Sequence, residues 1–357
     1  MKGVLASVMV TMLTMLVLSC ALSEGTSLDL SGNGWNGMES LASALDASAD
    51  ILQVDLTGAP LTAEERRTLL ARYPQVDFLW TVPLCGLEVS STATEVDLSG
   101  RWRGDLAELR DALDTLPHLE SVWMWNCSLN RSDQVALSQE YPDVFFGWTI
   151  TINSTHQLRT DDTAFSTLGR KPQLMPSNTQ AFTLCPNLLA LDIGHNTIMD
   201  LSFLYDCSKL KVLILADDEL EDITPLACQT ELEYLELFMN RITDISALAN
   251  MTQLRDVNLA YNDITDLSPL YELPHLERVW LMMNSRLTDE EVQRLREHQP
   301  DCEIVTRSDG ATGEVMRQDG SLIPGSSWRD HPHYFTIRYI FHGGGYIGWD
   351  EEIPQYQ

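Results

Sequence analysis

Apolar residues recur at a fixed spacing in the middle of the chain. Five leucines stand 22 residues apart, and we count each of them as position 0 of a repeat. Positions 3 and 5 are also apolar in every repeat, so apolar and polar residues alternate as they do in a strand with one buried face. A period of 22 residues leaves room for one short strand and a return containing little more than a 3₁₀ turn. The five leucines are Leu188, Leu210, Leu232, Leu254 and Leu276.

Two polar positions also repeat. Position 8 is Asp218 in the second repeat and Asn in the other four, and position 12 is Asp in the first four repeats. A short amide can bond the turning backbone, and we expect stacked copies to satisfy one another's buried polar groups. The position-12 carboxylate suits the start of a helical turn, where it accepts backbone N–H bonds. These residues are Asn196, Asn240, Asn262 and Asn284 at position 8, and Asp200, Asp222, Asp244 and Asp266 at position 12.

The N-terminal half repeats less regularly. The strand motif LDLSG at 28–32 returns as VDLTG at 54–58 and VDLSG at 96–100. Amphipathic stretches at 61–72, 130–140 and 288–300 predict helices, and a proline terminates each of them. We therefore expect irregular repeats with true helices over 20–155 and regular repeats over 188–305.

These residues carry a family resemblance. The segments NRITDISALANMTQL at 240–254 and NDITDLSPLYELPHL at 262–276 resemble the 22-residue leucine-rich repeats of bacterial internalin-type proteins. The resemblance implies an α/β solenoid, shaped as a horseshoe, with a parallel sheet on its concave face and short helices or 3₁₀ turns on its convex side. It also implies that the concave face binds a protein partner.

The remaining segments lack the period. Residues 156–187 contain Gly169, Pro172 and Pro176 and predict an irregular joint between the two halves. Residues 306–357 predict a cap that covers the last repeat, as solenoids require for solubility. Within that cap, the alternation of HYFTIRYIF at 333–341 predicts one or two strands.

The N-terminus predicts export. Lys2 precedes an apolar run from Val4 to Leu18, which is short for a membrane span and fits a secretory signal over 1–19. The sequence Val17-Leu18-Ser19-Cys20 resembles the lipobox of bacterial lipoproteins, which implies cleavage before Cys20 and lipidation of its thiol. The alternative is an ordinary signal peptide with an incidental cysteine. We expect an outward-facing protein that the lipid anchor alone holds to the membrane.

Charge excludes one class of partner. The chain of 357 residues has 23 Lys and Arg against 52 Asp and Glu, which gives a net charge of −29. Such a surface repels phosphate backbones, so we expect no binding to nucleic acid.

The sequence lacks the motifs of common enzymes. It contains no phosphate-binding Gly-Lys-Ser/Thr loop, GxSxG elbow, HExxH helix or CxxC pair, so we expect no catalysis, cofactor or metal. His331, His333 and His342 could be metal ligands but are more simply surface residues. Cys185 and Cys207 share one repeat position, so they either fill core volume as thiols or form a disulfide.

Large apolar side chains gather on the predicted concave face near its C-terminal end. Exposed aromatic and Met residues mark interaction surfaces, so we predict that this patch binds a protein. A cell-wall glycan is an alternative ligand, and an envelope enzyme with its site in 306–357 is an alternative function. The C-terminal segment could also fold back and cover this face. The predicted binding residues are Tyr234, Glu236, Phe238, Met239, Tyr261, Trp280, Met282 and Met283, with Trp123 and Trp125 as a second patch.

Overall fold

The chain forms two compact units. The first ends at Trp148 and the second begins at Thr149. The structure, a computed structural model, describes residues 22–23, 27–102, 104–167, 173–306 and 333–354. The predicted signal peptide and Cys20 lie outside these residues. No helix in the described ranges is both long enough and apolar enough to cross a membrane.

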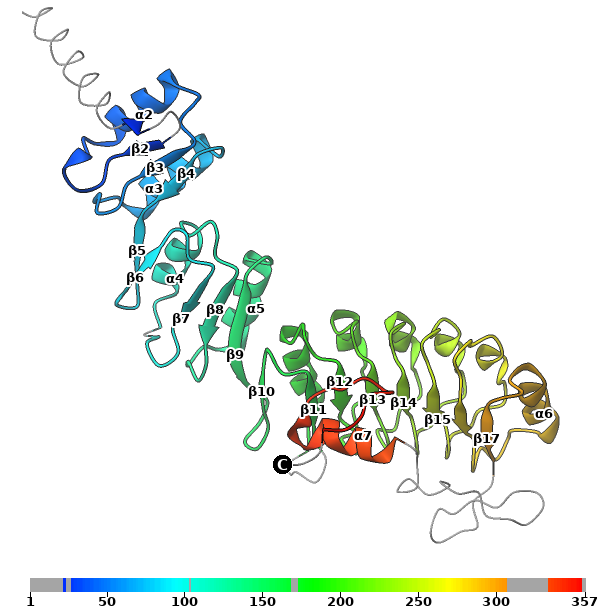
Figure 1. Cartoon of the computed structure of the whole chain (residues 1–357). Coiled ribbons are helices and arrows are strands. Elements are labelled where there is room, and N and C mark those ends of the chain that lie inside the picture. Colours follow the sequence, from blue (N-terminus) through cyan, green and yellow to red (C-terminus); the bar gives the residue numbers. More distant parts are fainter. Residues whose placement is uncertain (1–21, 24–26, 103, 168–172, 307–332, 355–357) are drawn as a thin grey trace, which may run out of the picture. The chain divides into compact units, whose positions relative to one another are not determined.

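The first unit contains two short sheets with helices on one side (Figure 1). The first sheet has β1 antiparallel to β2, followed by β3 and β4 in parallel order, and the second begins with β7, β8 and β9 in parallel. A hairpin, β5–β6, follows β4. The elements are β1 (Leu22–Ser23), β2 (Ser27–Asp29), η1 (Gly32–Gly34), α2 (Met38–Ala47), β3 (Gln53–Asp55), α3 (Ala63–Arg72), β4 (Asp77–Leu79), β5 (Thr81–Leu84), β6 (Leu87–Ser90), β7 (Glu95–Asp97), α4 (Leu106–Leu113), β8 (Ser121–Met124), α5 (Arg131–Glu140) and β9 (Phe145–Thr151).

The two sheets of this unit are copies of one module. Strands β2, β3 and β4 begin at residues 27, 53 and 77, and β7, β8 and β9 begin at residues 95, 121 and 145, which is 68 residues later in each case. Helices α3 and α5 follow the same shift, and each begins at a side-chain cap, Thr62 and Asn130, that accepts a bond from the backbone three residues on. The predicted helices at 61–72, 130–140 and 288–300 are confirmed as α3, α5 and α6.

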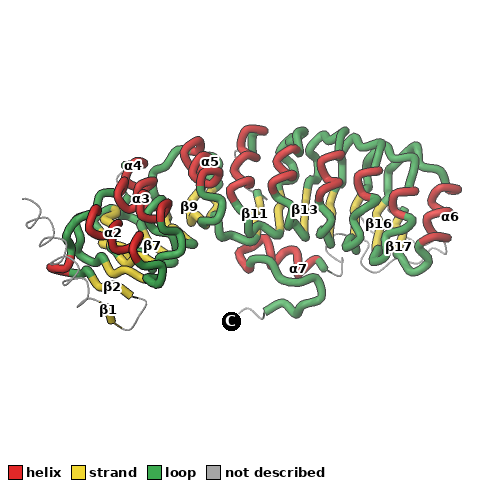
Figure 2. Tube along the Cα trace, turned by 90° about the horizontal axis from the view of Figure 1, so that it is seen from above, coloured by secondary structure: helices red, strands yellow, loops and turns green. Residues whose placement is uncertain are grey.

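The second unit is a regular array. Seven parallel strands, β11 to β17, pair in sequence order, and equivalent residues of successive repeats face one another. In Figure 2 the 3₁₀ turns and α6 lie along one side of the strands and α7 lies on the other. The elements are β10 (Gln157–Arg159), β11 (Ala164–Ser166), η2 (Pro176–Leu184), β12 (Ala190–Asp192), η3 (Ser202–Asp206), β13 (Val212–Ile214), η4 (Thr224–Cys228), β14 (Tyr234–Glu236), η5 (Ser246–Leu248), β15 (Asp256–Asn258), η6 (Ser268–Leu270), β16 (Arg278–Trp280), α6 (Asp289–His298), β17 (Glu303–Val305), α7 (Tyr334–Tyr339) and the π-helical turn η8 (Ile340–Gly344).

The repeat positions have the predicted structural roles. Asn240 accepts bonds from the backbone N–H groups of Asp218 and Leu220, and its amide donates to the carbonyls of Leu215 and Leu237. Each position-12 carboxylate accepts the N–H of the residue two positions on, as Asp244 does from Ser246 at 2.8 Å. The apolar residues at positions 0, 3 and 5 are buried throughout the array. The fold is a leucine-rich repeat solenoid.

Two predictions for the irregular segments are wrong. Residues 156–187 contain β11 and η2, which stack on β12 and η3 as a further repeat of the array, although the predicted period is missing there. Residues 333–341 contain helix α7 and the start of η8 rather than strands, because Ile337 and Ile340 lie on one helical face that packs against the sheet.

Cys185 and Cys207 are separate buried thiols in the structure. Burial raises the pKa of Cys207 to about 12, so this thiol stays protonated.

Candidate functional site

The face of the seven-stranded sheet opposite the 3₁₀ turns carries the predicted binding residues. Tyr234 pairs in register with Asp256, which pairs in turn with Arg278, and Glu236 pairs with Asn258, which pairs in turn with Trp280. Parallel strands lie about 4.8 Å apart, so side chains from different repeats form continuous columns across this concave face.

The C-terminal segment covers the first part of the concave face. Ile337, Ile340 and Trp349 form a buried cluster with Ala190, Val212 and Tyr234 of the sheet. The indole of Trp349 stacks on the Tyr234 ring with centroids 5.4 Å apart. The His333 ring also stacks on Trp349, at a centroid distance of 4.0 Å. This segment therefore covers strands β12 to β14 rather than the last repeat.

Polar contacts fix this segment at its edges. The guanidinium of Arg255 forms two hydrogen bonds to Asp350, 2.7 and 2.9 Å long, and a third to Glu277. The N–H of Tyr346 donates to the hydroxyl of Thr163, and the ammonium of Lys211 lies 5.9 Å from the Tyr346 ring centroid. A two-bond Arg–carboxylate contact also fixes orientation, so these bonds determine where the segment lies.

Tyr234 and Glu236 are consequently not exposed, which corrects two of the predicted binding residues. Tyr234 is 1% exposed and Glu236 is 7% exposed. The Tyr234 hydroxyl donates to a Glu236 carboxylate oxygen at 2.6 Å. Burial raises the pKa of Glu236 to about 7, against the opposing effect of the bond from Tyr234.

Trp280 and Met282 also differ from the prediction. They form a second buried cluster with Ala260 and Val305, against which the half-buried Phe238 packs. Sequence alternation places these side chains on the concave face correctly, but it does not show that they cover one another. Trp280 and Met282 therefore lie beneath the exposed surface and are not themselves accessible to a partner.

Four of the predicted residues remain accessible. Met239, Tyr261 and Met283 are exposed, and the ring of Phe238 meets that of Tyr261 edge to face at a centroid distance of 5.0 Å. We call Phe238, Met239, Tyr261 and Met283 the apolar ridge. It crosses three neighbouring repeats, because Met239, Tyr261 and Met283 all occupy position 7.

Position 7 has an unusual backbone. All five residues there have positive φ, between 56° and 62°, although none is glycine. Left-handed backbone costs an ordinary L-residue roughly 1–2 kcal/mol, and Asn, Asp and His tolerate it best. His195 and Asp217 at the start of the array follow that preference, whereas Met239, Tyr261 and Met283 do not. Sequence patterning identifies the column, but only the backbone angles reveal this cost.

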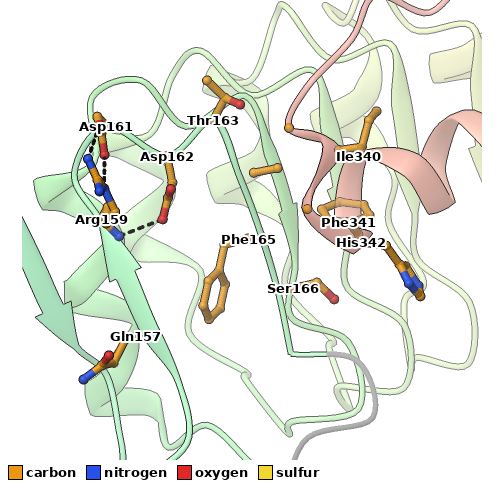
Figure 3. A pocket seen from close by; sticks show the side chains of 13 residues that line it. Gln157, Arg159, Asp161, Asp162, Thr163, Phe165, Ser166, Ile340, Phe341 and His342 are labelled. Atoms are coloured by element: carbon orange, nitrogen blue, oxygen red, sulfur yellow. Dashed lines mark hydrogen bonds and ion pairs between the residues drawn. The ribbon is translucent and has the colours of Figure 1, made fainter. Parts of the chain in front are cut away.

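The second unit also contains a cavity of about 810 Å³ beside β10 and β11 (Figure 3). Arg159 forms two hydrogen bonds to Asp161, both 2.8 Å long, and its backbone N–H donates to Asp162. Burial raises the pKa of Asp162. Residues 340–343 and Gly345 form the opposite wall, so part of the predicted cap borders this cavity. Its charged groups already bond one another.

Comparison with known proteins gives matches in structure only. No protein-family model matches the sequence, and no curated protein matches it. The chain is similar to an internalin (inlF) from Listeria monocytogenes at 18% identity and a TM-score of 0.36, covering 77% of this chain and 64% of that one. It is similar to an internalin C2 (inlC2) of the same species at 19% identity and a TM-score of 0.35, covering 70% and 93%. A leucine-rich repeat protein of Leptospira interrogans gives 17% identity and a TM-score of 0.33, covering 55% and 50%.

Proposed function

We propose that this protein is an extracytoplasmic leucine-rich repeat protein, anchored in the cell envelope through Cys20, that binds a protein partner through the apolar ridge. The ridge replaces the wider patch that the sequence predicted, because four members of that patch are buried. Catalysis has no part in this proposal.

The observation that carries the proposal is the choice of residues at position 7. Asn or Gly would adopt the left-handed backbone there at lower cost, and a polar residue would suit an exposed site. Instead, Met239, Tyr261 and Met283 are apolar, and they are 43%, 41% and 64% exposed. Since neither backbone preference nor burial explains these side chains, contact with a partner is the explanation that we favour.

The ridge has the anatomy of a binding hot spot. A rigid aromatic pair, Phe238 and Tyr261, stands at its centre, and flexible methionines flank it. Phe238 packs against the buried cluster that contains Trp280 and Met282. Aromatic anchors on a preorganised base bind with little loss of side-chain entropy.

A binding screen with matched variants tests this function. The purified protein and its M239N/Y261N variant are applied to an array of purified extracellular proteins, with His195→Asn as a control at the same position of the first repeat. We expect at least one partner that the control binds as the wild type does and that the double variant binds about thirtyfold or more weakly. A protein that binds all three forms equally, or glycan binding that depends on the ridge, would contradict the proposal.

Anchoring is tested separately. We expect mass spectrometry of the membrane fraction to find Cys20 as an acylated N-terminal residue, and Cys20→Ala to release the protein or leave its precursor unprocessed. Cleavage elsewhere without a lipid would exclude the anchor but would not affect the ridge.

A further inference from the structure

The first unit carries a separate aromatic cluster on its second sheet. Val122 and Met124 of β8 are buried beneath the helices, and the alternate residues Trp123 and Trp125 are half-buried on the opposite face. The two indoles stack with centroids 5.6 Å apart, and Phe145 of β9 meets Trp123 edge to face at the same distance.

A glycine makes room for these rings. Gly147 pairs in register with Trp123. A Cβ atom at Gly147 would lie 2.4 Å from an atom of the Trp123 ring and 2.9 Å from one of Trp125, so any side chain there would displace the indoles. The rings therefore occupy the space that a side chain at position 147 would fill.

The duplicated module shows that the fold does not need this cluster. The equivalent positions of the first sheet lie 68 residues earlier in the chain. Asp55 and Thr57 stand there in place of Trp123 and Trp125, and Asp77 and Leu79 in place of Phe145 and Gly147. The same backbone thus forms without an aromatic cluster on this face, where three of the four equivalent residues are polar. The aromatic residues serve some purpose other than folding of the module.

Carboxylates border the cluster on one side. Glu95 and Asp97 of the neighbouring strand β7 are exposed, and the indole N–H of Trp123 donates to Glu95 at 3.3 Å. Asp97 pairs in register with Trp123. Hydrogen bonds from Ser99 hold the pKa of Asp97 below its usual range, and the positive charge of Arg101 contributes a smaller lowering. None of the six paired positions on this face carries Lys or Arg.

We propose that Trp123, Trp125, Phe145, Glu95 and Asp97 form a binding site for an arginine side chain of a partner protein. A guanidinium is planar and weakly hydrated, so it stacks on an indole while its N–H groups reach a carboxylate. Lysine can approach the rings but lacks this planar fork. The net charge of −29 favours approach of a basic segment.

Matched peptides test the arginine site on the full chain. The probes are the peptide Ac-Ser-Arg-Gly-Arg-Ser-amide and its citrulline counterpart, which keeps the shape but loses the charge, with binding measured by calorimetry at constant salt. We expect the arginine peptide to bind about tenfold more tightly or better. Glu95→Gln, an exposed substitution, and Trp125→Leu should each reduce that difference to about threefold or less.

Asp29→Asn on β2 is the control, because it makes the same charge change on the first sheet and should leave arginine binding unchanged. Thermal melts of all variants verify folding, and Glu95→Gln keeps the test valid if Trp125→Leu unfolds. Equal binding of the two peptides, or equal weakening by Asp29→Asn and Glu95→Gln, would overturn the proposal. So would binding of maltohexaose that requires Trp125, because that result identifies a sugar platform.

Discussion

Trp349 stacks on Tyr234 across the concave face, with ring centroids 5.4 Å apart and planes 27° from parallel. This contact joins the C-terminal segment to the middle of the repeat array. It converts a tyrosine that the repeat pattern places on the surface into a core residue, and it leaves the apolar ridge as the accessible part of the predicted patch.

Trp349→Ala should therefore destabilise the protein by about 3–5 kcal/mol, as truncation of a buried Trp usually does. We expect a lower melting temperature and faster trypsin cleavage after the exposed Arg338. Phe335→Ala in helix α7 of the same C-terminal segment is the control, because Phe335 is 64% exposed. Equal behaviour of the two variants would mean that the segment does not dock through Trp349.

Leu237→Ala should cost about 2–5 kcal/mol, because Leu237 is fully buried between neighbouring repeats. Asn240→Ala should cost about 1–3 kcal/mol, since it removes bonds to four backbone groups of the stacked turns, of which the Leu237 carbonyl keeps a bond from Asn262. Urea titration measures both changes. Met239→Ala, between them in sequence and exposed, should leave the free energy of unfolding nearly unchanged, and a large loss there would contradict the register.

Asp218→Asn should stabilise the protein. One oxygen of Asp218 accepts the N–H groups of Asn196 and Ile198, but the other oxygen, Oδ2, is buried and has no hydrogen-bond partner among the described residues. In the next repeat, the side-chain NH₂ of Asn240 occupies the same repeat position and donates to the carbonyls of Leu215 and Leu237. Asn at position 218 would likewise offer an NH₂ donor in place of the unpaired Oδ2. We expect a gain of about 1–3 kcal/mol from satisfying that group.

The size of this gain should depend on pH. Burial raises the pKa of Asp218 to about 7, above its value in the unfolded chain. Between about pH 4 and 7 the native state then binds more protons than the unfolded state, so stability falls as pH rises through this window. The gain from Asp218→Asn should be larger at pH 8 than at pH 5. Asp263→Asn, at an exposed position two repeats further along the array, is the control, and a gain independent of pH would show that the Asp218 carboxylate does not ionise in this range.

Trp280→Ala should destabilise the protein and Tyr261→Asn should not, although both residues belong to the predicted patch. Trp280 is 5% exposed within a packed cluster, so its truncation should cost about 3–5 kcal/mol. Tyr261→Asn relieves a left-handed tyrosine and should leave stability unchanged or raise it by up to about 1 kcal/mol. Thermal melts distinguish them, and a large loss in Tyr261→Asn would make the ridge part of the core.

The sequence alone determined the repeat register. Leu188 to Leu276 at a spacing of 22, the position-8 Asn residues and the position-12 Asp residues predict the strands, the stacked turns and the caps, because each role depends on contacts within a repeat or with the next one. The same local logic predicted helices α3, α5 and α6 from amphipathic stretches that a proline terminates.

Tertiary structure decided which side chains of the concave face remain exposed. Tyr234 lies beneath Trp349, and Trp280 lies within a cluster that includes Val305; neither contact leaves a trace in the repeat period. The same limit applies to residues 333–341, where alternation predicted strands but packing of Ile337 and Ile340 on the sheet produces a helix. Periodicity reports which way a side chain points from its own strand. What covers that side chain depends on segments distant in sequence, whose positions only the folded chain determines.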